Sequence, residues 1–211
     1  MPDYDIVELW DTIEHVVQNP GDVANGYLEV LDYCRAAHPH ADWQGLANLD
    51  IAADLAHLES WFRSLLGTEP PQAGVERFWF MLGNYCKSDG RDTADMELIG
   101  GAFRDAEPDW FDDFPWQPEN GLADSRVLDR IYSIAYSGNG GLGNDAEYPL
   151  CLTYAALAAR HLATVSNRLL LLGAASRRVI QVGFHDGDYI FVGAATENGF
   201  KLSRNSQQLD I

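Results

Sequence analysis

The residues whose types and spacing best suit a specific chemistry lie between positions 105 and 125. This segment holds seven carboxylates, four large aromatic side chains, three prolines and no Lys or Arg. Aromatic side chains anchor protein interfaces and carboxylates select basic groups, so the segment predicts a surface for a basic partner. We expect the contacts to come from Glu107, Asp109, Trp110, Asp112, Asp113 and Trp116. In the alternative interpretation, the aromatic side chains fill the core under a long loop and the acids face water.

Neither group of potential metal ligands in the chain has the spacing of a known site. Residues 105–125 lack the alternating Asx spacing and the central glycine of a calcium-binding EF-hand loop. A second group comprises Cys34, His38, His40 and Asp42. Structural zinc sites separate two ligand pairs across a loop, which this group does not, and His38 is expected at a helix end near the negative pole of the helix dipole. The sequence therefore predicts no metal and no cofactor.

A glycine-rich stretch, Gly138 to Gly143, matches the G-x-G-x-x-G pattern of phosphate-binding loops. The segment before it has helical rather than strand periodicity, and no acidic residue follows about 20 positions later to hold a ribose. The stretch is therefore predicted to be a loop between two helices. Asn144 and, three residues later, Glu147 are expected to cap the second of these helices.

Catalysis by a nucleophilic side chain has little support in the sequence. The chain contains neither a GxSxG nor an SxxK motif. Cys151 and His161 share a predicted helix but lie about 80° from a common face, and Cys86 has no identifiable histidine partner. With 32 acids some pair of carboxylates will always be close, so their number is no specific sign of a hydrolase. The sequence therefore favours a protein that is not an enzyme.

The chain carries a formal net charge of −18, from 14 Lys and Arg against 32 Asp and Glu. Residues 1–159 hold 28 of the acids and eight of the bases, whereas residues 160–211 hold four acids and six bases. Bare nucleic acid and anionic membranes are poor partners for such a chain, because both need Lys and Arg to replace their counterions. A basic partner, either a protein or a polyamine-like molecule, is the better electrostatic match. The sequence does not specify an oligomeric state.

Hydrophobic periodicity and chain breakers place the elements that must position these residues. Helical spacing of apolar residues predicts helices over 4–18, 22–37, 50–67, 125–136 and 145–164. Apolar runs predict strands near 76–85, 95–103, 178–184 and 189–194, joined as two hairpins, with Asp186-Gly187 as the turn of the second. This order predicts an α+β fold, a single domain over 1–211 in which about five helices pack on a small antiparallel sheet. Its helical N-terminal layer spans about 4–67, and a mixed remainder spans 75–202.

Three features predict a soluble, cytoplasmic protein. No Lys or Arg precedes Arg35, so the N-terminus lacks the basic start of a secretory signal. The longest strongly apolar run, Leu169 to Ala175, is far shorter than the ~20 residues that cross a bilayer. Three cysteines without CxxC spacing suit reduced thiols better than a disulfide framework.

The leading hypothesis is a non-enzymatic, acidic intracellular binding protein that engages or masks a basic protein surface, such as that of a toxin or a nucleic-acid-binding protein. Bacterial immunity proteins and nucleic-acid mimics follow this electrostatic logic, and the likeness is one of charge and size only. The alternative is a small cytosolic enzyme whose carboxylate- and Trp-lined cleft acts on a neutral or cationic small molecule. A third hypothesis is a structural or oligomerising protein whose charge provides solubility. A deep pocket with a carboxylate of strongly shifted pKa favours the enzyme, and a flat or convex acidic face favours the binder.

Overall fold

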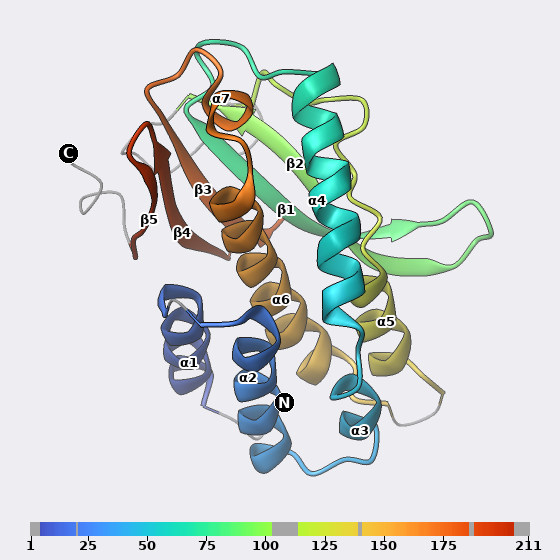
Figure 1. Cartoon of the computed structure of the whole chain (residues 1–211). Coiled ribbons are helices and arrows are strands. Elements are labelled where there is room, and N and C mark those ends of the chain that lie inside the picture. The colour runs from blue at the N-terminus through green and yellow to red at the C-terminus, as the bar shows by residue number, and fades with distance from the viewer. Residues whose placement is uncertain (1–4, 20, 103–113, 139–140, 186–187, 205–211) are drawn as a thin grey trace.

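Helices gather on one face of a five-stranded sheet in the computed structural model of this chain (Figure 1). The structure describes residues 5–19, 21–102, 114–138, 141–185 and 188–204. The helices are α1 (Ile6–Gln18), α2 (Val23–Ala37), α3 (Trp43–Leu46), α4 (Ile51–Thr68), α5 (Arg126–Ala135), α6 (Asn144–Val165) and α7 (Arg168–Leu172). The strands are β1 (Arg77–Cys86), β2 (Asp92–Gly101), β3 (Arg177–Phe184), β4 (Tyr189–Thr196) and β5 (Gly199–Leu202). The predicted α+β class is confirmed.

The long N-terminal helices begin where aspartates cap them. Asp5 and Asp22 each accept hydrogen bonds from two backbone N–H groups in the first turn of α1 and α2. Asp50 does the same for one N–H group of α4. The five predicted helices are confirmed, and the described residues add α3 and α7. At four and five residues, these two are too short to show a repeating apolar pattern.

The strand order in the sheet is β2-β1-β3-β4-β5. Both predicted hairpins are confirmed, because β1 pairs antiparallel with β2, and β3 with β4. The sheet is mostly antiparallel, as predicted, and is mixed where the hairpins meet, since β1 and β3 run parallel with Arg77 beside Val179. Strand β2 already returns the chain to the end at which β1 began, and the segment that contains α5, α6 and α7 leads from there to the start of β3 at the same end of the sheet. The short strand β5 extends the sheet beside β4, and the expected turn residues Asp186 and Gly187 lie outside the described residues.

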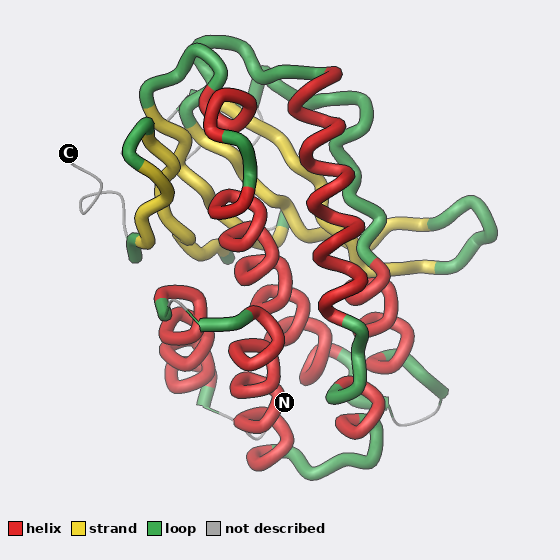
Figure 2. Tube along the Cα trace, viewed as in Figure 1, coloured by secondary structure: helices red, strands yellow, loops and turns green. Residues whose placement is uncertain are grey.

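Helix α6 forms the centre of the core, with every residue from Leu150 to Ala159 buried. It contacts α1, α2, α4 and α5 as well as β1, β3 and β4. Figure 2 shows α4 and α6 in front of the sheet, with α1 and α2 below it. Near its C-terminal end, Arg160 donates hydrogen bonds to the carbonyl oxygens of Val17 (2.9 Å) and Gly21 (2.6 Å). These bonds satisfy carbonyl groups where α1 ends and fasten the N-terminal helices to α6. Among the described residues, no helix combines the length and apolar character needed to span a membrane.

The other face of the sheet bears a second, smaller apolar cluster. Trp79 of β1, Ile99 of β2 and Phe114 pack together there. The rings of Trp79 and Phe114 lie 5.3 Å apart, and the guanidinium of Arg77 lies 4.5 Å from the centre of the Phe114 ring. We call this side the far face of the sheet, in contrast to the face that the helices cover.

Candidate functional site

Five of the six residues predicted to contact a partner lie outside the described residues, and their role stays a prediction: Glu107, Asp109, Trp110, Asp112 and Asp113. The sixth, Trp116, has an exposed fraction of 6% and belongs to the core under the helices. Its ring stacks on Phe78 with 5.2 Å between the ring centres, and its backbone exchanges hydrogen bonds with Gly100 of β2. Phe114 is also buried. For these two aromatic side chains the structure supports the core-filling interpretation.

A densely acidic surface lies on the α1–α2 pair. Residues 5–19 and 21–37 contain one arginine and no lysine against seven carboxylates, an excess of six negative charges: Asp5, Glu8, Asp11, Glu14, Asp22, Glu29 and Asp32. The single arginine, Arg35, forms an ion pair with Asp32 at 2.9 Å. The apolar stripes of both helices face the core, so their carboxylates are held outward. We call this region the α1–α2 surface.

Apolar side chains lie among these carboxylates. Ile6 and Val7, in the first turn of α1, have exposed fractions of 53% and 66%. Beside them, the hydroxyl group of Tyr33 on α2 donates to a carboxylate oxygen of Glu8 at 3.1 Å. Desolvation and this hydrogen bond raise the pKa of Tyr33 to about 12, so the phenol remains a donor at neutral pH. The α1–α2 surface therefore combines negative charge with an exposed apolar pair.

A second group of acids is buried where α4, α5 and α6 meet, and we call it the buried junction. Asp54 of α4 accepts hydrogen bonds from the Ser125 hydroxyl, the Tyr154 hydroxyl and the backbone N–H of Arg126, at 2.6, 2.6 and 2.8 Å. Its exposed fraction is 1%. Burial and the neighbouring Asp54 raise the pKa of Tyr154 far above its usual range. Asp54 thus joins three helices and is closed to a substrate.

Asp95 of β2 belongs to the same junction. One of its oxygens accepts from the backbone N–H groups of Met96 (2.9 Å) and Ser125 (3.0 Å). Burial raises the pKa of the Asp95 carboxyl to about 6, against the lowering effect of these hydrogen bonds. A shifted carboxyl is typical of catalytic sites when it lies in a cleft. Asp95 lines none of the cavities described below, and its hydrogen bonds join β2 to the residue that caps α5.

The described part of the glycine-rich stretch lies in the loop between α5 and α6, as predicted. The predicted cap by Asn144 and Glu147 is wrong. Gly143, with a φ of 55°, is the N-cap residue, so Asn144 is already the first helical residue and its side chain cannot cap. Glu147 is buried and accepts instead from the Tyr136 hydroxyl.

The side chains of Cys34, His38, His40 and Asp42 are not arranged as a set of metal ligands. Cys34 is buried, and burial followed by the charge of Asp145 raises the pKa of its thiol to about 12. His38 is the C-cap residue of α2, as expected of a helix end, and its Nδ1 lies 3.0 Å from a carboxylate oxygen of Asp145. Over the ranges that the structure describes, no three His, Cys, Asp or Glu side chains are placed to hold a metal ion.

A cavity of about 380 Å³ lies between β5, α6 and the start of α2. Two further cavities touch the sheet. The smaller of these, of about 160 Å³, lies on the far face beside Trp79 and Phe114 and is also lined by Glu97 and His185. The hydroxyl group of Tyr85 lies 3.4 Å from a Glu97 oxygen. The lining of this cavity contains a Trp side chain and a carboxylate, the two residue types that the alternative hypothesis expects in an active-site cleft.

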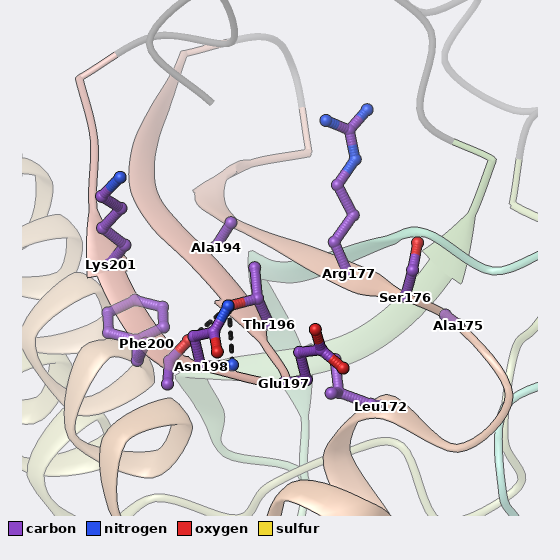
Figure 3. A pocket seen from close by; sticks show the side chains of 11 residues that line it. Leu172, Ala175, Ser176, Arg177, Ala194, Thr196, Glu197, Asn198, Phe200 and Lys201 are labelled. Atoms are coloured by element: carbon purple, nitrogen blue, oxygen red, sulfur yellow. Dashed lines mark hydrogen bonds between the residues drawn. The ribbon is translucent and has the colours of Figure 1, made fainter. Parts of the chain in front are cut away.

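The larger cavity, of about 610 Å³, lies at the end of the sheet where β3 begins and β4 turns into β5 (Figure 3). Arg177 of β3 and Lys201 of β5 line it, and the one carboxylate in its described lining is that of Glu197. The turn is held by the Thr196 hydroxyl, which donates to the Gly199 carbonyl and accepts from the Asn198 backbone N–H, both at 3.2 Å.

Sequence reasoning missed both the buried junction and the larger cavity. One signal for the junction exists, because Asp54 sits in the apolar stripe of α4, at helical spacing from Ile51, Leu58 and Phe62. The cavity has no such signal, since residues more than 20 positions apart line it.

Comparisons with protein-family models, curated proteins and solved structures find no match to this chain.

Proposed function

We propose that this chain is a non-enzymatic, acidic binding protein that engages and masks a basic protein surface. The observation that carries the proposal is the α1–α2 surface, where seven carboxylates, two of them helix caps, outnumber a single arginine. The described carboxyl with a raised pKa, Asp95, is buried in a hydrogen-bonded junction rather than in a cleft. Both observations favour a binder over an enzyme.

Surface charge and buried apolar anchors contribute differently to the energetics of such an interface. A large excess of negative charge attracts a basic partner over a long range and raises the association rate, most strongly at low salt. Charged groups at the rim contribute little to final affinity, which depends on desolvated anchors near the centre. Ile6 and Val7 are the exposed apolar side chains that lie among these acids. We propose that they are the anchors and that the carboxylates surround them.

The proposed partner is a basic protein inside the cell, such as a toxin or a nucleic-acid-binding protein. An active site or groove that is shaped for phosphates also attracts a carboxylate-rich surface, which is the logic of immunity proteins and of nucleic-acid mimics. Three free cysteines, two of them buried, are compatible with a reducing, cytoplasmic compartment. The predicted contacts of Glu107, Asp109, Trp110, Asp112 and Asp113 form a second part of this proposal.

The test compares two variants of equal charge. Asp11→Lys with Glu29→Lys changes the α1–α2 surface, and Asp92→Lys with Glu197→Lys changes exposed acids outside this surface and outside residues 105–125. Each pair alters the net charge by +4, from −18 to −14. In a pull-down from the native host, a basic protein should be retained in stoichiometric amount by the wild type and by the Asp92/Glu197 variant.

The Asp11/Glu29 variant should associate with that identified partner about tenfold more slowly at low salt, and the difference should shrink at high salt. Equal losses in the two variants would mean that only net charge matters, which contradicts a defined surface.

The far-face cavity supports a second candidate, an enzyme acting on a small neutral or cationic molecule. Trp79 and Glu97 provide an aromatic wall and a carboxylate, a combination that suits amines. The cavity of about 160 Å³ is below the ~300 Å³ of common ligand sites, so its occupant must be small. Turnover of a small amine that Glu97→Gln abolishes, with the fold unchanged, would replace the binding proposal with this one.

A further inference from the structure

We propose that the cavity between β5, α6 and the start of α2 receives an aromatic side chain of the basic protein partner, one that has Lys or Arg residues next to it. We call this cavity the α6 groove. It measures about 380 Å³, within the ~300–1,000 Å³ typical of sites that enclose a small molecule, so it has room for a large side chain. The inference rests on the proposed function, because it names the group that would hold a basic partner beside the α1–α2 surface.

Apolar side chains form two walls of the α6 groove. Phe200 and Leu202 alternate along β5, and Phe200 pairs with Ala195 of the main core, so both point toward the helices. Leu55 of α4 lines the groove from another side, and Figure 1 shows α6 between that helix and β5. All three side chains are only partly buried. They lie on the helix-covered face of the sheet and offer apolar surface to one occupant.

The polar side chains of α6 in the lining already have partners within the protein. Arg160 is 6% exposed, and its guanidinium donates to four backbone carbonyl groups between residues 16 and 21. The Nε2 atom of His161 lies 2.8 Å from a carboxylate oxygen of Glu59, and the Thr164 hydroxyl donates to the Arg160 carbonyl at 2.8 Å. Because these groups are satisfied, the groove gains most from an occupant that buries apolar surface.

The α1–α2 surface begins at the edge of the α6 groove. Asp22 lines the groove and caps α2, where it accepts from the N–H groups of Ala24 and Asn25. The exposed Glu29 follows seven residues later, so it lies on the same side of the helix, about 10 Å away. A lysine two residues from the buried aromatic group can reach that distance, since an extended chain rises ~3.4 Å per residue and the side chain adds to it. This arrangement favours basic residues next to the aromatic one.

The groove and the exposed pair Ile6 and Val7 lie at opposite ends of α1. The helix has 13 residues and is therefore about 20 Å long. A standard interface of ~800 Å² per partner is about 30 Å across and covers this length. Buried aromatic side chains in pockets are frequent hot spots of such interfaces, and carboxylates around them add selectivity for a basic partner. The partner would thus be held by apolar contacts at both ends of an acidic surface.

The test is a titration of the full chain with small probes, followed by two-dimensional amide NMR. The probes are the acetylated and amidated peptides Lys-Lys-Trp-Lys-Lys, Lys-Lys-Ala-Lys-Lys and Glu-Glu-Trp-Glu-Glu, together with N-acetyltryptophanamide. The first peptide should shift the amide signals of Val23, Thr164 and Leu202 in a saturable way. It should bind at least about tenfold more tightly than the other three probes, because it alone combines an aromatic group with basic neighbours.

Thr164→Trp provides the decisive variant, because Thr164 is exposed on α6 and an indole at this position fills the groove. It should reduce the affinity for Lys-Lys-Trp-Lys-Lys to that for the alanine peptide. The matched control is Thr68→Trp on α4. Thr68 is also exposed, its hydroxyl likewise donates to the carbonyl four residues earlier, and it lines none of the described cavities. The control should leave the affinity within about twofold.

Leu55→Ala serves as a second variant, since it removes part of one wall without adding bulk. It should weaken the binding of Lys-Lys-Trp-Lys-Lys about fivefold. Unchanged binding in both groove variants, with native-like spectra, would overturn the inference.

Failure of the inference and failure of the proposed function give different results. Equal affinities for the Trp and Ala peptides of lysine would overturn the inference alone, since salt-sensitive shifts on α1 and α2 by both peptides would still support the proposed function. Equally tight binding of N-acetyltryptophanamide would also overturn it, in favour of a site for a small aromatic molecule. Equally tight binding of the Glu peptide, or no saturable shift with any probe, would contradict a basic partner and therefore the proposed function as well.

Discussion

The acids of the α1–α2 surface and those of the buried junction are the same residue types in opposite environments. On α1 and α2, Asp11 and Glu29 are exposed and lie on helix sides that turn away from the core. In the junction, Asp54 and Asp95 are almost completely buried and accept hydrogen bonds from α5, α6 and β2. The first group creates a negative electrostatic potential outside the protein, and the second stabilises the fold through hydrogen bonds.

This difference shows why a net charge of −18 is a poor measure of a binding surface. Aspartates at helix N-caps and in the junction contribute to the formal charge, yet their side chains are committed to backbone and hydroxyl donors. Exposed carboxylates without such donors remain able to meet a basic group. Substitutions in the buried junction should therefore change stability, whereas substitutions of exposed acids should change association with a partner.

The largest effect is expected from Asp54→Ala. The change leaves the Ser125 and Tyr154 hydroxyls and one backbone N–H buried without their acceptor, so it should lower the free energy of unfolding by about 3–5 kcal/mol. The matched change on the α1–α2 surface, Asp11→Ala, should remain within about 0.5 kcal/mol of the wild type. Urea unfolding measures both values, and similar losses in the two variants would contradict the distinction.

A smaller effect is expected from Asp95→Asn, and it depends on pH. Because burial raises the pKa of Asp95 to about 6, the folded state holds this proton more tightly than the unfolded chain does. The resulting stabilisation is complete below pH ~4 and is lost as the pH rises through about 6. Relative to the Asn variant, the wild type should lose about 2–3 kcal/mol of stability across that interval.

Unfolding curves at a series of pH values for both proteins provide the measurement. A constant difference between them at all pH values would show that Asp95 does not carry a raised pKa. The Asp11→Ala variant serves as the control, because its difference from the wild type should be small throughout.

The smallest effect concerns partner association through the predicted segment. Reversing Asp109, Asp112 and Asp113 to Lys should lower the affinity for an identified basic partner about tenfold and reduce its salt dependence. Affinities measured at low and high salt for this variant, the Asp11/Glu29 variant and the wild type would show which acidic region dominates. If the triple change altered neither affinity nor salt dependence, the contacts assigned to residues 107–113 would be wrong.

Prediction from sequence worked where the physical cause was local. Helices α1, α2, α4, α5 and α6 follow from apolar spacing, and both hairpins follow from apolar runs between turn residues. It failed where the outcome depended on distant contacts. The parallel pairing of β1 with β3 joins segments about 100 residues apart, and periodicity carries no information on which strand edges meet.

The candidate sites follow the same division. The acidic character of residues 1–159 and the weakly basic character of 160–211 are properties of the sequence alone. Tertiary structure decided that Trp116 stacks on Phe78, that Asp54 lies inside the core, and that β4 separates Arg177 from Lys201. Net charge is a sum over residues and does not depend on the fold. The exposure of a side chain and its contacts with distant residues are defined only once long-range packing has formed the core.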